Sequence, residues 1–236
     1  MIRTLLCDLD DTLFDHSGAT RDALAVVRDA MPAFQVWSLE QFDREHRVVL
    51  EALHLQVLAG RWTVEEARVE RFRQLLQTAG VVESRADVLD GVSWQYRHAY
   101  EAAWRMIPGA IALAQAAKAD GWQFVIVTNN VVREQRLKVE RGGLLPFVDA
   151  LVTSEEFGAS KPDPRIIHHA IAQVGSVAGQ SVVFGDSLST DIAGARAAGV
   201  SAVWFNRWAA PSPDPALREV RSLEPAAEIL RILAKR

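Results

Sequence analysis

Three carboxylates follow an apolar run near the start of the chain. Residues 2–6 are predicted to form a buried strand, and Asp8, Asp10 and Asp11 come just after it. Strand alternation would place Asp8 and Asp10 on the same side of the chain, about 6–7 Å apart. Carboxylates that close repel each other unless they share a proton or bind a cation. Because Mg²⁺ takes oxygen ligands, this stretch predicts a metal site with one carboxylate left for chemistry.

Polar side chains recur at the ends of three further predicted strands. They are Thr128 and Asn129 after 124–127, Lys161 after 150–152, and Asp186 after 181–184, with Asp191 five residues further on. Ligands of open α/β sheets bind at the carboxyl ends of the strands. Carboxylates that hold Mg²⁺, groups that bind phosphate oxygens and a carboxylate that attacks phosphorus are together suited to phosphoryl transfer.

Each of these residues also has a purely structural explanation. The acidic residues after the first strand could cap a turn, and Thr128 and Asn129 could cap the next helix. Lys161 could be a solvated loop residue, although the 26 lysines and arginines include only four lysines. Asp191 could lie on the surface of a helix. These explanations account poorly for such residues at four successive strand ends.

The elements that must position these residues alternate after residue 108. Apolar strands are predicted at 124–127, 150–152, 181–184 and 201–204, and helices at 110–119, 131–141, 164–174 and 190–198. Buried strands alternating with helices predict an α/β fold with a doubly wound, mainly parallel sheet. A proline-rich loop at 210–215 and a helix near 225–234 follow the last strand.

A helical block separates the first strand from the rest of this sheet. Helices are predicted at 21–30, 38–59, 63–80 and 85–105, the second and third opening with the capping boxes Ser38–Gln41 and Thr63–Glu66. We therefore expect a core domain, 1–14 with 108–236, and an inserted all-helical domain, 15–107. Its two connections would let it act as a lid over the acidic strand end.

Composition is that of a globular protein and argues against several classes. The chain has 236 residues, 49% apolar and 24% charged, and its net charge of -4 gives no nucleic-acid footprint. No apolar run reaches transmembrane length, and the start lacks a signal-peptide pattern. The single cysteine, Cys7, allows no disulfide within the chain, which fits a reducing cytoplasm. We expect a cytoplasmic monomer or homodimer with no nucleic-acid polymer or membrane as partner.

As a set, the motifs resemble those of the haloacid dehalogenase (HAD) superfamily of phosphatases. The four family motifs are matched in order by residues 8–12 (DLDDT), residues 128–129 (TN), Lys161, and residues 185–191 (GDSLSTD). The helical insertion resembles the family's small (C1-type) cap. Residues 128–204 are most similar to the pyrimidine 5′-nucleotidase group, apart from Asn130, where that group commonly has glycine.

The resemblance implies Mg²⁺-dependent hydrolysis of a small soluble phosphate ester through an aspartyl-phosphate, a nucleoside monophosphate being one candidate. Asp8 would be the nucleophile, and Asp10 would protonate the leaving oxygen and later activate water. Asp8, the backbone carbonyl of Asp10, and Asp186 would bind Mg²⁺. The residues that would surround the phosphate are Thr128, the amide of Asn129, and Lys161, with Asp191 supporting the metal site or orienting Lys161.

Two other functions use similar residues. A 2-haloacid dehalogenase of the same fold attacks carbon with its aspartate and needs no metal; Asp10, placed to serve ester hydrolysis, argues against it. A phospho-aspartate switch also combines aspartates, a threonine and a lysine on a doubly wound sheet. There the phosphorylated aspartate follows a later strand, whereas here the acidic cluster starts the chain. Both functions remain alternatives.

Overall fold

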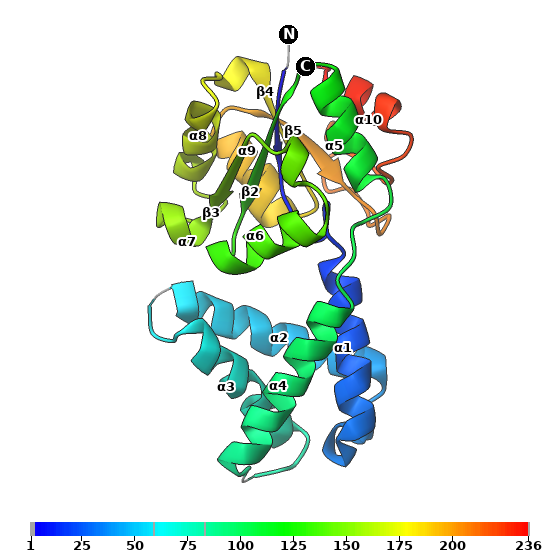
Figure 1. Ribbon diagram of the computed structural model, residues 1–236, viewed down its shortest axis with the longest axis vertical. Coiled ribbons are helices and arrows are strands. Elements are labelled where there is room, and N and C mark those ends of the chain that lie inside the picture. The colour runs from blue at the N-terminus through cyan, green and yellow to red at the C-terminus, as the bar shows by residue number, and fades with distance from the viewer. Residues whose placement is uncertain (1–2, 59, 83, 236) are drawn as a thin grey trace. The chain divides into compact units, whose positions relative to one another are not determined.

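The core of the protein is a parallel sheet with strand order β3-β2-β1-β4-β5-β6 (Figure 1). The computed structural model describes residues 3–58, 60–82 and 84–235. The strands are β1 (Thr4–Cys7), β2 (Gln123–Thr128), β3 (Ala150–Thr153), β4 (Ser181–Gly185), β5 (Ser201–Phe205) and β6 (Glu219–Val220). All neighbouring strands pair in parallel, so the predicted α/β class with a doubly wound sheet is confirmed.

Helices cover both faces of this sheet because its central strands are apolar on both sides. The helices of this part are α5 (Ala110–Ala119), α6 (Val132–Arg141), α7 (Ser154–Phe157), α8 (Pro164–Gln173), α9 (Ala193–Ala197) and α10 (Ala226–Leu233). Leu6, Val125 and Val183 pack with α8 and α9 in one buried cluster. The helices α5 and α10 lie on the other side of the sheet (Figure 1). The apolar layers thus fix the strand ends from which the polar residues project.

The described chain divides into two compact units, 1–15 with 105–236 and 16–104, named here the core unit and the helical unit. The segments that lead into and out of the helical unit pair with each other. The amide of Asp15 donates to the carbonyl of Arg105 at 3.0 Å, and the amide of Ile107 donates to the carbonyl of Leu13 at 2.8 Å. Phe14 and Met106 form an antiparallel bridge between them.

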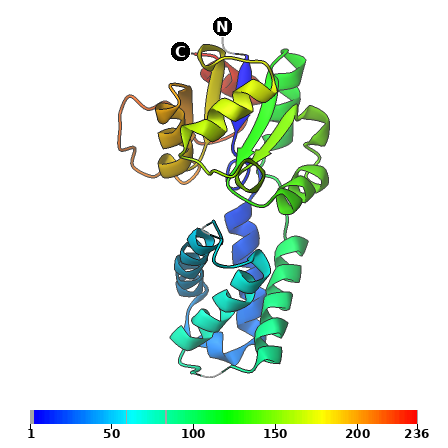
Figure 2. The same ribbon diagram turned by 90° about the vertical axis from the view of Figure 1, so that its left-hand side faces the viewer.

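The helical unit contains α1 (His16–Ala30), the 3-10 turn η1 (Pro32–Val36), α2 (Leu39–Leu58), α3 (Val64–Thr78) and α4 (Ala86–Ala102) (Figure 2). Both predicted capping boxes are present, Ser38 with Gln41 and Thr63 with Glu66. Phe34 and Phe42 stack with ring centroids 4.5 Å apart and are fully buried. None of the helices described in either unit has the length and apolar character needed to cross a membrane.

The structure corrects several details of the predicted elements. The predicted ends at Ile2 and Ala59 lie outside the described residues. The helix predicted at 190–198 begins as a π-helical turn, η4 (Leu188–Ile192), before α9. The short elements α7 and β6 were missed, because four and two residues are too few to show a period.

Candidate active site

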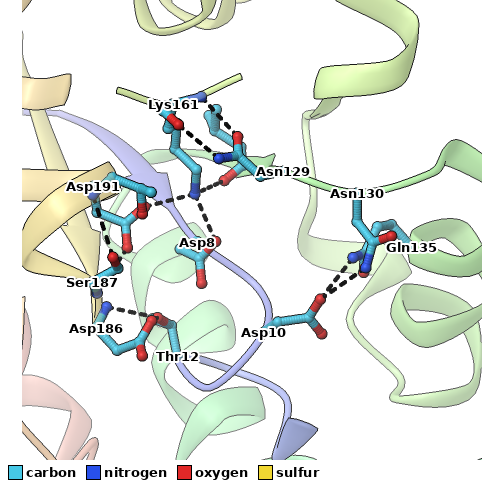
Figure 3. Close-up of polar contacts among 12 residues, drawn as sticks. Asp8, Asp10, Thr12, Asn129, Asn130, Gln135, Lys161, Asp186, Ser187 and Asp191 are labelled. Atoms are coloured by element: carbon cyan, nitrogen blue, oxygen red, sulfur yellow. Dashed lines mark hydrogen bonds and ion pairs between the residues drawn. The ribbon is translucent and has the colours of Figure 1, made fainter. Parts of the chain in front are cut away.

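The first acidic motif lies in a tight loop after β1 (Figure 3). The amide of Asp8 still bonds to the neighbouring strand, at 2.9 Å from the carbonyl of Phe184. The chain then turns, since the amides of Leu13 and Phe14 both donate to the carbonyl of Leu9 at 2.9 Å. Regular strand geometry therefore ends before Asp10, which lies in this turn, so the alternation used to place Asp8 and Asp10 does not apply there. Figure 3 shows the carboxylate of Asp10 pointing toward Asn130 and Gln135.

Lys161 joins the ends of three strands. Its Nζ lies 2.6 Å from Oδ1 of Asp8, 2.6 Å from Oδ1 of Asp191, and 2.7 Å from the carbonyl of Val127. The lysine is 4% exposed, so its charge is compensated by these partners rather than by water. The structure thus brings together three of the predicted site residues.

The predicted phosphate-binding residues at the end of β2 lie beside the loop of Lys161. Thr128 is buried at the last position of the strand. The side chain of Asn129 donates to the carbonyl of Lys161 at 2.8 Å and accepts from its amide at 2.7 Å. These two hydrogen bonds resemble those between paired strands. They fix the backbone of Lys161, whose ammonium group is buried. The side chain of Asn129 is therefore used in positioning the loop.

Asp186 and Asp191 follow β4, which pairs with β1 on the side opposite to β2. The amide of Asp186 donates to the hydroxyl of Thr12 at 3.1 Å, which ties the end of β4 to the first motif. The carboxylate of Asp191 accepts from the amide of Ser187 at 3.1 Å. Position 185 must be glycine, since a Cβ there would collide with the carboxyl group of Asp191. The π-helical turn η4 brings Asp191 under this strand end.

The site holds more negative than positive charge. Burial raises the pKa of Asp8, and the negative charges of Asp191 and Asp10 add to this, although Lys161 opposes them. Burial also raises the pKa of Asp186, with further contributions from its acidic neighbours. Burial alone would lower the pKa of Lys161, but Asp191 and Asp8 raise it, so the ammonium stays charged. One buried cation thus faces several carboxylates.

The donor set fits a hard divalent cation. Asp8, Asp186 and Asp191 each offer an oxygen, and these oxygens lie within 4.8 Å of one another. Carboxylate oxygens are the ligands that Mg²⁺ prefers, and its charge would offset the burial and the repulsion that raise the pKa of Asp8 and Asp186. The carboxylate of Asp10 is not part of this described trio.

The Asp10 carboxylate instead contacts Lys138 and Gln135, which no motif singles out, and Asn130, which stands where the nucleotidase group commonly has glycine. Lys138 Nζ lies 2.7 Å from its Oδ1, and Gln135 Nε2 lies 2.8 Å from its Oδ2. Asn130 Nδ2 lies 3.3 Å from Oδ2 (Figure 3). The rarity of lysine, which made Lys161 conspicuous, applies equally to Lys138 and would have singled it out.

Comparisons with known proteins agree with this arrangement. The profile of the haloacid dehalogenase-like hydrolases matches residues 2–199. Phosphoserine phosphatase of Thermus thermophilus is 33% identical over 93% of this chain and 95% of its own. Pyrimidine 5′-nucleotidase YjjG of Escherichia coli is 36% identical over 42% of this chain and 44% of its own. These relatives and the family support phosphatase activity.

A solved structure is similar over nearly the whole length. The HAD-hydrolase YfnB of Bacillus subtilis, in a form bound to magnesium, superposes with a TM-score of 0.75 at 28% identity and covers 99% of both chains. The family match spans the first strand, the helical unit and the strand ends that carry the four motifs. The resemblance inferred from the motifs is confirmed, and the chain belongs to the haloacid dehalogenase-like hydrolases.

Proposed function

We propose that this hydrolase cleaves a small phosphate monoester with Asp8 as nucleophile and Mg²⁺ as cofactor. The observation that carries the proposal is the buried cluster in which Lys161 bonds to Asp8 and Asp191 at 2.6 Å each, beside Asp186. Asp8, Asp186 and the backbone carbonyl of Asp10 would hold the metal, with Asp191 supporting the site. Bound there, Mg²⁺ supplies positive charge that offsets the charge of the phosphate oxygens.

In the first half-reaction, a carboxylate oxygen of Asp8 forms a bond to phosphorus. The bond from phosphorus to the ester oxygen breaks, and Asp10, in its acid form, gives its proton to the leaving alkoxide. Lys161 holds phosphate oxygens together with the hydroxyl of Thr128 and the amide of Asn129. The products are a phosphorylated Asp8 and a free alcohol.

In the second half-reaction, Asp10 takes a proton from a water molecule as that water attacks phosphorus. The bond from phosphorus to Asp8 breaks, which restores the carboxylate and releases inorganic phosphate. One carboxylate thus serves as acid and then as base. That the helical unit covers the site during this cycle stays a prediction from its two connections.

The function is tested with purified protein, p-nitrophenyl phosphate and Mg²⁺. We expect repeated turnover by the wild type and a loss of at least about a thousandfold in Asp8→Asn, because an amide does not attack phosphorus as a carboxylate does. Asp120→Asn is the matched control, since Asp120 is exposed and pairs at the surface with Arg3 at 3.5 Å. It should keep wild-type activity.

Three outcomes would contradict the proposal. Retention of more than a few per cent of activity by Asp8→Asn would remove Asp8 from the nucleophile role. Halide release from 2-chloropropionate in the absence of Mg²⁺ would favour the dehalogenase. A single phosphorylation event without turnover would favour a switch.

Once turnover is established, a panel of nucleoside monophosphates, phosphoserine and sugar phosphates identifies the leaving group. We propose a nucleoside as the first candidate.

A further inference from the structure

The helix α6 presents a buried polar face to the first acidic loop. Glu134 and Gln135 lie about one helical turn before Lys138, and the three side chains are 8%, 0% and 1% exposed. A helix of this polar composition would ordinarily turn such residues to water. Burying an ammonium and an amide is costly unless each has a partner, so their burial calls for an explanation.

The partner that α6 residues share is Asp10. Lys138 Nζ lies 2.7 Å from its Oδ1, and Gln135 Nε2 donates to its Oδ2 at 2.8 Å. From the loop before the helix, Asn130 Nδ2 adds a contact at 3.3 Å to the same oxygen. Both carboxylate oxygens are thus held by side chains that follow β2; Figure 3 shows the contacts of Asn130 and Gln135 to one of them.

Lys138 is itself held in place from two further sides. Glu134 Oε1 lies 3.2 Å from its Nζ, one helical turn away. The ring of Phe14 lies under the ammonium, 4.7 Å from Nζ to the ring centroid. An ammonium above an aromatic face is attracted by it. A lysine fixed from several directions orients a carboxylate more sharply than a solvated lysine does.

The amide of Gln135 shows that this arrangement is retained at some cost. Its Oε1 is buried without a hydrogen-bond partner among the described residues. A buried, unsatisfied carbonyl destabilises the fold, whereas an apolar residue at position 135 would avoid that loss. What the glutamine provides instead is the hydrogen bond from Nε2 to Asp10.

We propose that Lys138 and Gln135 are positioning residues that hold the carboxylate of Asp10 where it exchanges protons with the leaving group and with water. This rests on the proposed function, since it assigns these side chains a part in the acid–base role of Asp10. They touch neither substrate nor metal in the proposed cycle. Their removal therefore impairs proton transfer and leaves the attack by Asp8 intact.

The test compares p-nitrophenyl phosphate with phenyl phosphate, which have similar shapes but leaving groups of different acidity. The phenol released from phenyl phosphate has a pKa of about 10, as tyrosine has, and needs a proton far more than p-nitrophenolate does. We expect Lys138→Met and Gln135→Leu to lower kcat for phenyl phosphate by about tenfold or more. The decrease in burst rate with p-nitrophenyl phosphate should be several times smaller.

Two comparisons separate positioning from a general loss of structure. Lys118→Met is the matched control, because Lys118 forms a partly exposed pair with Asp149 at 2.6 Å; it should leave both substrates unaffected. In the double variant with Asp10→Asn, Lys138→Met should cost almost nothing further, because its effect acts through Asp10. Thermal unfolding checks that each variant is folded. If Lys138→Met does not fold, the test is made with Gln135→Leu.

Equal losses with both substrates, or losses that multiply with that of Asp10→Asn, would overturn the proposal. So would wild-type kinetics in both Lys138→Met and Gln135→Leu. These results leave the proposed function standing if Asp8→Asn is inactive. Activity in Asp8→Asn would instead remove the proposed function itself, so the two failures are distinguishable.

Discussion

The core unit and the helical unit both bury titratable side chains, and they compensate for that burial differently. In the core unit the ammonium groups of Lys138 and Lys161 each contact two carboxylates. In the helical unit His46 is 1% exposed, and its Nε2 has no hydrogen-bond partner among the described residues. The core unit therefore pairs its buried lysines with carboxylates, whereas the helical unit buries this imidazole as a neutral ring, although Glu70 and Arg71 are buried there too.

The environment of His46 explains why it stays neutral. Burial lowers its pKa well below the usual value, and the positive charges of Arg71, His16 and Arg47 lower it further. Its ring lies 5.3 Å from that of Tyr96, centroid to centroid. The imidazole thus packs as an aromatic residue. The comparison teaches that the buried ammonium groups of the core unit are paired with carboxylates, whereas the helical unit buries its imidazole in the neutral form and packs the buried guanidinium of Arg71 over the ring of Tyr96.

Metal removal should have the largest effect, confined to the core unit. We expect EDTA to abolish phosphatase turnover, a loss of about a thousandfold or more, and Mg²⁺ to restore it. Mg²⁺ at 100 times its Kd should also stabilise the fold by about 2.7 kcal/mol. Hydrogen exchange should show the added protection at the ends of β1 and β4 and none in α2 and α3.

Full activity in chelator would contradict the metal assignment of Asp8 and Asp186. Equal protection of both units by Mg²⁺ would contradict the contrast between them.

Asp10→Asn should give the next largest effect. Turnover of phenyl phosphate should fall by roughly a hundredfold to ten-thousandfold, because both proton transfers are lost. With p-nitrophenyl phosphate the first step survives better, so a burst near one equivalent of enzyme should precede slow turnover. Intact mass should show a phosphorylated enzyme, heavier by about 80 Da.

Equal loss with both substrates, with no burst and no adduct, would make Asp10 a positioning residue only. The acid–base role would then belong to another group.

Lowering the pH should reduce the stability of the helical unit because of His46. Because its folded-state pKa is lowered, the unfolded chain binds a proton that the folded chain does not. The stability of this unit is therefore complete above the pKa of an unfolded histidine, about 6.5, and falls below it by up to about 1.4 kcal/mol per pH unit. Urea unfolding followed by hydrogen exchange in α2 and α3 measures this.

The control is His46→Leu, which removes the titrating group and keeps an apolar side chain. The difference in unfolding free energy between the wild type and this variant should shrink or reverse as pH falls from 7 to 5. A pH-independent difference would show that His46 does not govern the response.

The smallest effect is expected at a helix cap. Thr63→Ala removes the side chain that accepts from the amide of Glu66 at 3.2 Å and should cost about 1 kcal/mol. The change should appear in the unfolding of the helical unit and leave kcat for p-nitrophenyl phosphate unchanged. Ser38→Ala, at the other capping box, is the matched comparison. A change in kcat would mean that α3 influences the chemistry.

The sequence predicts most of the core unit because its strands are continuous apolar runs that end in polar residues. Asp8, Lys161, Asp186 and Asp191 were all expected at these ends, and the structure places them in one cluster. Their convergence follows from parallel topology, which aligns the carboxyl ends of strands.

The hydrophobic periodicity of the sequence does not predict the contacts of α6. Glu134, Gln135 and Lys138 look like one polar face of a surface helix, and only the turn at Leu9 brings Asp10 against them. That turn is held by hydrogen bonds to the carbonyl of Leu9, which no hydrophobic period in the sequence indicates. Likewise, the π-helical turn at Asp191 carries no local signal.

The pairing of residues 13–15 with 105–107 bears on the order in which the chain folds. β1 and β2 are adjacent, with Thr4 opposite Gln123, yet a long stretch of chain separates them. If the helices of 16–104 form first from their local contacts, they bring Asp15 to Arg105. The loop that the sheet must close then shrinks from about 115 residues to about 27, which lowers the entropic cost by roughly 1 kcal/mol. The inserted unit is thus expected to lower the entropic cost of pairing β1 with β2, the two strands that it separates in the sequence.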